Sequence, residues 1–230
     1  MLNLFFLVMN MGLIISLKPY VFLCLLPGML FWLYSAYMHK IPNPLLKTLA
    51  LPFLVAIIGV IGYFTFSSVS SSMGVYGEVD TAIQRAQIIQ QDLLRAEQYG
   101  GNNYYLGEID GSVGNMLALA PAAVLTALYR PMFWEIGSPT MVISVIENSI
   151  LVLFTLFLLV RVNPIKYVWI IISEPILLYA LVFSLVFAFG VGVAGTNFGA
   201  LVRYKIPLIP FFYSAMYIVY DLSKREQKSV

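Results

Sequence analysis

Charged residues are scarce in this chain. Only 10% of its 230 residues are Asp, Glu, Lys or Arg, and 60% are hydrophobic, whereas a soluble domain carries about 25% charged residues. The mean hydropathy is +0.88. A water-soluble protein of this size could not bury so much apolar surface, but a lipid bilayer can solvate it because its interior is itself apolar. The composition therefore predicts an integral membrane protein.

Residues that bind metals or form disulfides are scarcer still. The chain contains one cysteine, Cys24, and one histidine, His39, so neither an intramolecular disulfide nor a bis-histidine haem site can form within it. No Cys/His spacing typical of a metal site is present in the sequence. We therefore expect no metal and no other cofactor.

Signs of a nucleic-acid or nucleotide partner are also missing. The net charge is only +2, and the basic residues are scattered between apolar runs instead of forming a stripe. The sequence contains neither a P-loop nor a GxGxxG motif placed after a strand. These absences argue against nucleic acid, and we expect membrane lipids as the first partner.

What the chain does contain is a series of long apolar segments, separated by proline-, glycine- or charge-rich breaks. Each is interpreted as a membrane span, since a helix of about 20 apolar residues crosses the bilayer. The segments cover residues 2–17, 21–38, 45–66, 140–160, 167–194 and 206–220. We predict an all-α, polytopic transmembrane helix bundle of about six spans. Its N-terminal transmembrane helices lie in residues 1–66, and its C-terminal transmembrane helices and basic tail lie in residues 138–230.

Two regions between these groups of spans have a different character. Residues 67–114 carry six acidic and two basic residues, and apolar residues recur at spacings of three and four from Val79 to Ala96. This pattern predicts an extracytoplasmic insert with an amphipathic helix that packs on the bundle or, alternatively, gates a substrate or binds a partner. Residues 115–137 are interrupted by Pro121 and contain three aromatics near their end, which favours a re-entrant or interfacial segment.

The basic residues predict an orientation, because Lys and Arg favour cytoplasmic loops. With six spans, both termini lie in the cytoplasm together with most of the basic residues. Those on the cytoplasmic side are Lys40, Lys47, Arg161, Lys166, Lys224, Arg225 and Lys228. Lys18, Arg85, Arg95, Arg130, Arg203 and Lys205 then remain on the outer side of the membrane.

Charged groups inside a membrane are costly and are therefore candidates for function. Glu147 lies inside a predicted span, either as a catalytic carboxylate or as a buried structural partner for Arg130 or Arg203. Arg203 and Lys205 follow the glycine-containing stretch at Asn197 and would suit a lipid diphosphate. Interfacial snorkelling is the alternative for these two basic residues. The candidates are thus Glu147 and Arg203 for catalysis, and Arg130, Asn197 and Lys205 for ligand binding.

Two segments of the C-terminal half resemble a known family. Residues 128–135 read LYRPMFWE and lead into the span with Glu147 and Asn148, and residues 197–210 read NFGALVRYKIPLIP. Together they resemble membrane proteins of bacterial polysaccharide gene clusters, similar in plan to Wzy-type O-antigen polymerases. The resemblance implies a bacterial inner-membrane protein that acts on undecaprenyl-diphosphate-linked oligosaccharide. Such enzymes are larger, so it also implies that this chain corresponds to the later part of one.

Two functions remain open at this point. In the first, the protein binds or polymerises lipid-diphosphate-linked sugars, with Arg130, Arg203 and Lys205 on the diphosphate and with Glu147 orienting a sugar hydroxyl or acting as general base. In the second, it is a non-catalytic accessory or structural subunit of a larger complex, with other membrane subunits as partners. The residues leave open whether the chain is an enzyme, and a transporter is less favoured because no inverted repeat is visible.

Overall fold

The computed structural model describes residues 2–38, 40–43, 103–110, 112–139, 141–195 and 197–228, together with short pieces between 45 and 91. Regular structure in these residues is helical, apart from an isolated bridge between Asn103 and Asn197. The predicted all-α class is therefore confirmed for this part of the chain. The amphipathic helix expected between Val79 and Ala96, and much of the third predicted span, fall outside the described residues.

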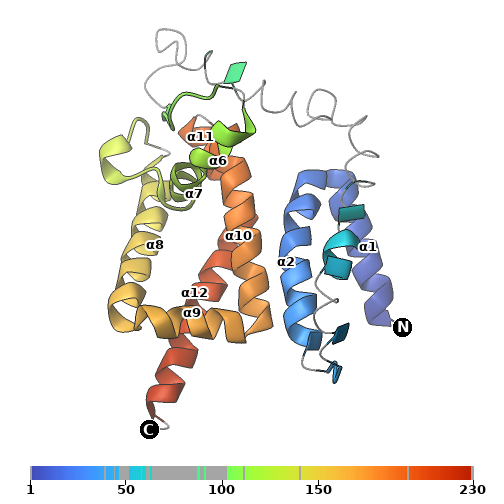
Figure 1. Cartoon of the computed structure of the whole chain (residues 1–230). Helices are drawn as coiled ribbons and strands as arrows, with labels where there is room; N and C mark the ends of the chain where they lie inside the picture. The colour runs from blue at the N-terminus through green and yellow to red at the C-terminus, as the bar shows by residue number, and fades with distance from the viewer. Residues whose placement is uncertain are drawn as a thin grey trace.

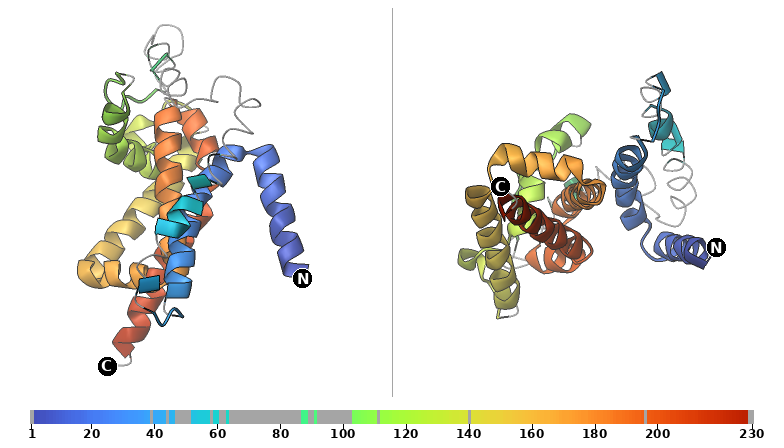
Figure 2. Two further views of the ribbon diagram at one scale, coloured as in Figure 1. Left: turned by 45° about the vertical axis from the view of Figure 1, so that its right-hand side comes forward. Right: turned by 90° about the horizontal axis from the view of Figure 1, so that it is seen from below.

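The helices form a bundle with a hairpin at one side (Figure 1). Within the described residues they are α1 (Leu2–Leu17), α2 (Pro19–Met38), α6 (Val113–Ala118), α7 (Ala120–Tyr129), the 3-10 turn η2 (Phe133–Glu135), α8 (Met141–Arg161), α9 (Pro164–Ser173), α10 (Pro175–Ala194), α11 (Phe198–Tyr204) and α12 (Leu208–Lys228). α1 and α2 are the hairpin, and α2 packs against α10 (Figure 2). Both chain ends lie toward the same end of the bundle, opposite α6, α7 and α11 (Figure 1).

Several of these helices are long and apolar enough to cross a membrane. In the described part of the chain they are Pro19–Tyr37, Met141–Arg161 and Pro175–Ala194. α11 and α12 add a fourth if they are taken as one span bent by 66°. The protein is therefore a helical membrane protein with three or four candidate spans by length and composition. The expectation of about six spans is not established by these helices.

The span predicted over residues 167–194 is wrong in its extent. The chain breaks at Glu174 and Pro175, and two helices, α9 and α10, replace one. Proline lacks an N–H and disfavours helical geometry in the residue before it, and Glu174 accordingly has an extended backbone, with φ −107° and ψ 103°. α9 lies across the end of the bundle, whereas α10 runs along it (Figure 1).

The segment at 115–137 forms α6, α7 and η2, which gather at the end of the bundle where α8 begins (Figure 1). α7 has only 10 residues, so it is about half the length that a helix needs to cross the bilayer. Asn115 donates its backbone N–H to the Ser112 hydroxyl, which caps α6. α7 and η2 flank Arg130 and Pro131, whose main chain belongs to the candidate site described below.

α10 is the central helix of the bundle and packs against α2, α7 and α12. Its contact with α7 depends on Gly192, because a Cβ atom at this position would lie 2.2 Å from the carbonyl oxygen of Ala123. A Cβ atom added at Gly28 of α2 would likewise lie 2.8 Å from the carbonyl oxygen of Tyr179. Small residues thus let the helix backbones meet, as is common in membrane bundles.

Candidate functional site

A buried lysine lies at the break between α11 and α12. Lys205 is only 2% exposed. Its ammonium donates to the side-chain oxygen of Asn148 at 2.6 Å and to the carbonyl oxygen of Arg130 at 3.1 Å. A buried ammonium needs such acceptors because burial removes its hydration. Lys205 therefore ties the α11–α12 break to α8 and to the end of α7.

Asn148 of α8 extends this connection by one more bond. Its amide nitrogen donates to the carbonyl oxygen of Pro131 at 3.1 Å, so one side chain bonds Lys205 on one side and the main chain after α7 on the other. Asn148 is 4% exposed. We call Lys205, Asn148 and the Arg130 and Pro131 carbonyls the Lys205 cluster. It joins three segments that lie far apart in the sequence.

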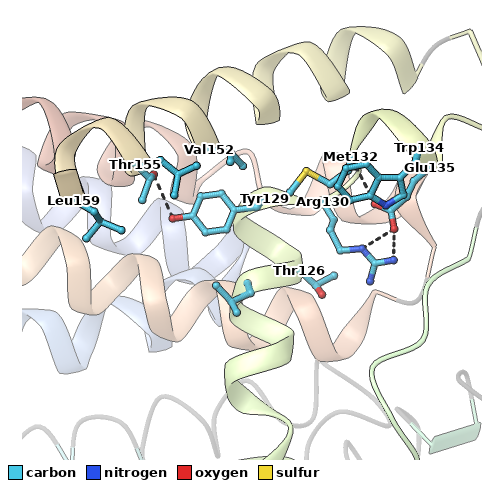
Figure 3. A pocket seen from close by; sticks show the side chains of 11 residues that line it. Thr126, Tyr129, Arg130, Met132, Trp134, Glu135, Val152, Thr155 and Leu159 are labelled. Atoms are coloured by element: carbon cyan, nitrogen blue, oxygen red, sulfur yellow. Dashed lines mark hydrogen bonds and ion pairs between the residues drawn. The ribbon is translucent and has the colours of Figure 1, made fainter.

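The side chain of Arg130 points away from this cluster and has partners of its own. Its guanidinium forms an ion pair with Glu135, with Nε at 2.8 Å from the carboxylate (Figure 3). The other carboxylate oxygen accepts the Met132 N–H at 2.8 Å. The guanidinium also lies 5.1 Å from the ring centre of Phe198 and 5.5 Å from that of Tyr104, within the range of cation–π attraction. The described ion pair of Arg130 is thus with Glu135, and the pairing with Glu147 considered from the sequence is wrong.

Tyr104 fixes the loop before α6 to the end of α10. Its hydroxyl donates to the carbonyl oxygen of Gly192 at 2.9 Å. Burial raises the pKa of the Tyr104 phenol, so the hydroxyl keeps its proton and remains a donor at neutral pH. This bond fixes the loop before α6 to α10, and the Tyr104 ring that contacts the Arg130 guanidinium is held in place by it.

A cavity of about 560 Å³ opens beside the Lys205 cluster, between α8 and α12. Its polar lining residues are Ser144, Glu147, Asn148, Lys205 and Tyr213, and the rest of its wall is apolar. Glu147 is exposed and lies close enough to Lys205 for an electrostatic interaction between the two side chains. The Tyr213 hydroxyl donates to the main-chain oxygen of Glu147 at 3.0 Å. The lining of this largely apolar space thus includes an acidic residue and a basic residue that interact electrostatically.

A second cavity, of about 490 Å³, lies between α7 and α8. Figure 3 shows the Arg130–Glu135 pair at one end and Tyr129 with Thr155 at the other. The Tyr129 hydroxyl and the Thr155 hydroxyl lie 3.3 Å apart. The Arg130–Glu135 and Tyr129–Thr155 side chains are bonded within each pair, and most of the remaining lining is apolar, so this space offers a ligand mainly apolar surface.

The two remaining candidates have local roles in the structure. The Asn197 side chain accepts the Gly199 N–H at 2.8 Å and caps α11, and its amide donates to Asn103 at 3.1 Å. Arg203 is exposed, and its Nε donates to the Gly199 carbonyl oxygen at 3.0 Å. Of the candidates, the structure brings Glu147 and Lys205 to one cavity, with the main chain of Arg130 behind it, and places Asn197 and the Arg203 side chain outside its lining.

Three polar residues of the cavity, Ser144, Asn148 and Tyr213, were not among the candidates. Asn148 directly follows Glu147 in a predicted span, and a polar residue there is a signal for function or buried bonding. Tyr213 gave no comparable signal, because tyrosine is ordinary in a membrane helix. No group of three potential metal ligands occurs among the described residues.

No family model, no curated protein and no solved structure matches this chain.

Proposed function

We propose that this protein binds, and polymerises, sugars linked to a lipid diphosphate in the assembly of a cell-surface glycan. The observation that carries the proposal is the α8–α12 cavity, where Glu147 and Lys205 face one space. A lipid-linked sugar is amphipathic. Its chain suits the apolar wall that includes Leu151 and Phe212, and its polar part suits the charged wall.

The chemistry assigns one role to each charged group. Glu147 takes the proton from a sugar hydroxyl whose oxygen attacks the anomeric carbon of the lipid-linked donor. The bond from that carbon to the diphosphate breaks, and the lipid diphosphate leaves with the electron pair. Lys205 stabilises the negative charge near the reacting groups. Arg203, which is exposed two residues before Lys205, holds the diphosphate outside the cavity, because its planar fork matches phosphate oxygens.

The proposal includes a location and a topology. The protein lies in a bacterial inner membrane with about six spans and with both termini in the cytoplasm. In its support, both chain ends lie toward the end of the bundle that carries Arg161 and Lys166, and basic residues favour the cytoplasmic side (Figure 1). The cavity then lies in the outer half of the membrane, where lipid-linked sugars are polymerised.

Glu147→Gln tests the function most directly, because it keeps size and removes the base. In a strain whose surface glycan depends on this protein, we expect polymer to fall at least about 100-fold, since general base catalysis contributes about 10²–10⁴-fold. Arg203→Ala should abolish polymer while the protein still inserts. Glu174→Gln, at the opposite end of the bundle, is the matched control and should leave polymer unchanged. Normal polymer length in both site variants would contradict the proposal.

The alternative is an accessory subunit of a larger membrane complex, and one observation favours it. α1 packs against α2 and otherwise exposes large apolar side chains such as Phe5, Leu7 and Leu13. A second membrane subunit could cover this face. Purification in mild detergent separates the two functions: a bound lipid-linked sugar supports the glycan enzyme, whereas a stoichiometric protein partner and a tolerated Arg203→Ala support the subunit.

A further inference from the structure

α9 lies across the bundle at the end opposite the cavity (Figure 1, Figure 2). One face packs on α12, where Ile170 meets Ala215 and Val219 in a buried cluster. The Tyr167 hydroxyl donates to the sulfur of Met216 at 3.0 Å, and the Lys166 ammonium donates to the carbonyl oxygen of Ser223 at 3.4 Å. These contacts fix α9 against α12 and determine which of its faces points outward.

The outward face of α9 is an apolar stripe. Ile165 is 81% exposed and Trp169 is 68% exposed, and Val168 and Ile172 are exposed between and beyond them. The four positions have spacings of three and four, so they follow one line along the helix. A contiguous exposed apolar surface of this kind is unfavourable in water.

The position of α9 shows where that stripe lies. α9 joins the end of α8 to the start of α10, which are both candidate spans, and is itself only 10 residues long. A helix that lies across the ends of spans runs in the plane of the membrane at its boundary with water. Apolar faces of such helices sit between headgroups and acyl chains, and tryptophan prefers this depth.

Positive charge surrounds the same boundary. Among the described side chains, the end of the bundle around α9 carries five basic residues and two acidic ones, whereas the cavity end carries equal numbers of each. The basic residues at the α9 end are Lys40, Arg161, Lys166, Lys224 and Arg225, and the acidic ones are Glu174 and Asp221. Anionic headgroups complement this surplus, because basic residues near a charged bilayer surface attract them.

We infer that α9 is an in-plane membrane helix that forms, with Arg161 and Lys224 beside it, a binding surface for anionic phospholipid. The apolar stripe takes the acyl chains near the glycerol level, and the basic residues take the headgroups. This inference does not depend on the chemistry of the α8–α12 cavity. A protein partner would need to cover a stripe that already lies at membrane depth, so we commit to lipid.

Trp169 provides a direct measure of depth, because the chain has only three tryptophans. The full chain with Trp32→Phe and Trp134→Phe is reconstituted into vesicles that contain phosphatidylcholine brominated at a shallow or a deep acyl position. We expect strong quenching of Trp169 fluorescence by the shallow label, weaker quenching by the deep label, and protection from aqueous iodide. Quenching by iodide without quenching by either brominated lipid would overturn the inference.

Headgroup preference is measured in the same variant by energy transfer from Trp169 to dansyl-labelled lipid. We expect dansyl phosphatidylglycerol to be enriched over dansyl phosphatidylcholine, and Arg161→Gln with Lys224→Gln to reduce this enrichment by about fivefold per charge removed. Lys18→Gln, at the other end of the bundle, is the matched control and should not change it. Equal transfer to both lipids, or no effect of the two substitutions, would contradict the anionic preference.

Discussion

α8 and α10 are both long apolar candidate spans, yet they hold the fold together in different ways. In α10, 50% of the most apolar window is buried inside the protein, against 22% in α8. α10 contains no charged residue, whereas α8 contains Glu147 and, at its end, Arg161. α10 is thus buried to a larger extent within the protein, whereas α8 leaves more of its surface exposed to other molecules.

The difference shows that packing and chemistry fall on different helices. α10 is stabilised by close packing of helix backbones, such as that between Gly192 and Ala123. α8 is held by a few polar bonds near its first half, through Asn148 and the main-chain oxygen of Glu147. The residues that make these bonds also line the α8–α12 cavity, so the polar bonds of α8 lie beside that space.

The largest effect is expected where α10 depends on shape. Gly192→Ala puts a Cβ 2.2 Å from the Ala123 carbonyl oxygen, so the α7 and α10 backbones must separate. We expect a loss of about 3 kcal/mol, at the upper end of typical overpacking costs. SDS titration in mixed micelles measures it. Gly190→Ala, on the same helix with nothing within 4 Å of the added atom, is the control and should stay near wild type. Equal loss in both would show that α10 is not held by close approach.

A smaller effect is expected where α8 depends on a polar bond. Asn148→Leu removes an acceptor from the buried Lys205 ammonium, and we expect a loss of about 2 kcal/mol, since hydrogen bonds to charged groups contribute about 1.5–3 kcal/mol. Lys205→Met should cost a similar amount. The same unfolding titration measures both variants.

The double variant Asn148→Leu/Lys205→Met provides the decisive comparison for this bond. With both partners apolar, no buried ammonium remains without this acceptor, so the double variant should lose clearly less than the sum of the single losses. Strict additivity would show that the two side chains do not act as a pair.

The smallest effect on stability is expected for a polar bond that lies within α10 itself. Ser184 is fully buried in α10, but its hydroxyl donates to the Ala180 carbonyl oxygen of the same helix, at 2.7 Å. That bond joins no second helix. We expect Ser184→Ala to change stability by less than about 1 kcal/mol, as measured beside Asn148→Leu. A loss as large as that of Asn148→Leu would remove the distinction between bonds within one helix and bonds between helices.

Part of the site could be predicted from the sequence. Glu147 was identified because charge inside an apolar run is costly and therefore informative. Lys205 was identified because, with Arg203, it follows the glycine-containing stretch at Asn197 and would suit a diphosphate. Both residues line the cavity. Arg130 was a candidate for ligand binding on the same side of the membrane as Arg203 and Lys205, but its side chain is engaged by Glu135. Spacing along the chain could not reveal this, because the turn η2 brings the Glu135 carboxylate back onto the Arg130 guanidinium.

The sequence by itself determined that this is a helical membrane protein, because hydrophobicity over about 20 residues is a local property that bilayer thickness converts directly into a span. It also contained the signal for the break before α10, which the single span predicted over residues 167–194 missed, since Pro175 acts on its immediate neighbour. Only the tertiary structure decided that Lys205 bonds Asn148, that Glu147 faces the same cavity, and that α9 turns its apolar stripe outward. Those features depend on how helices far apart in the chain pack, and a packing contact is a property of two surfaces that neither segment specifies alone.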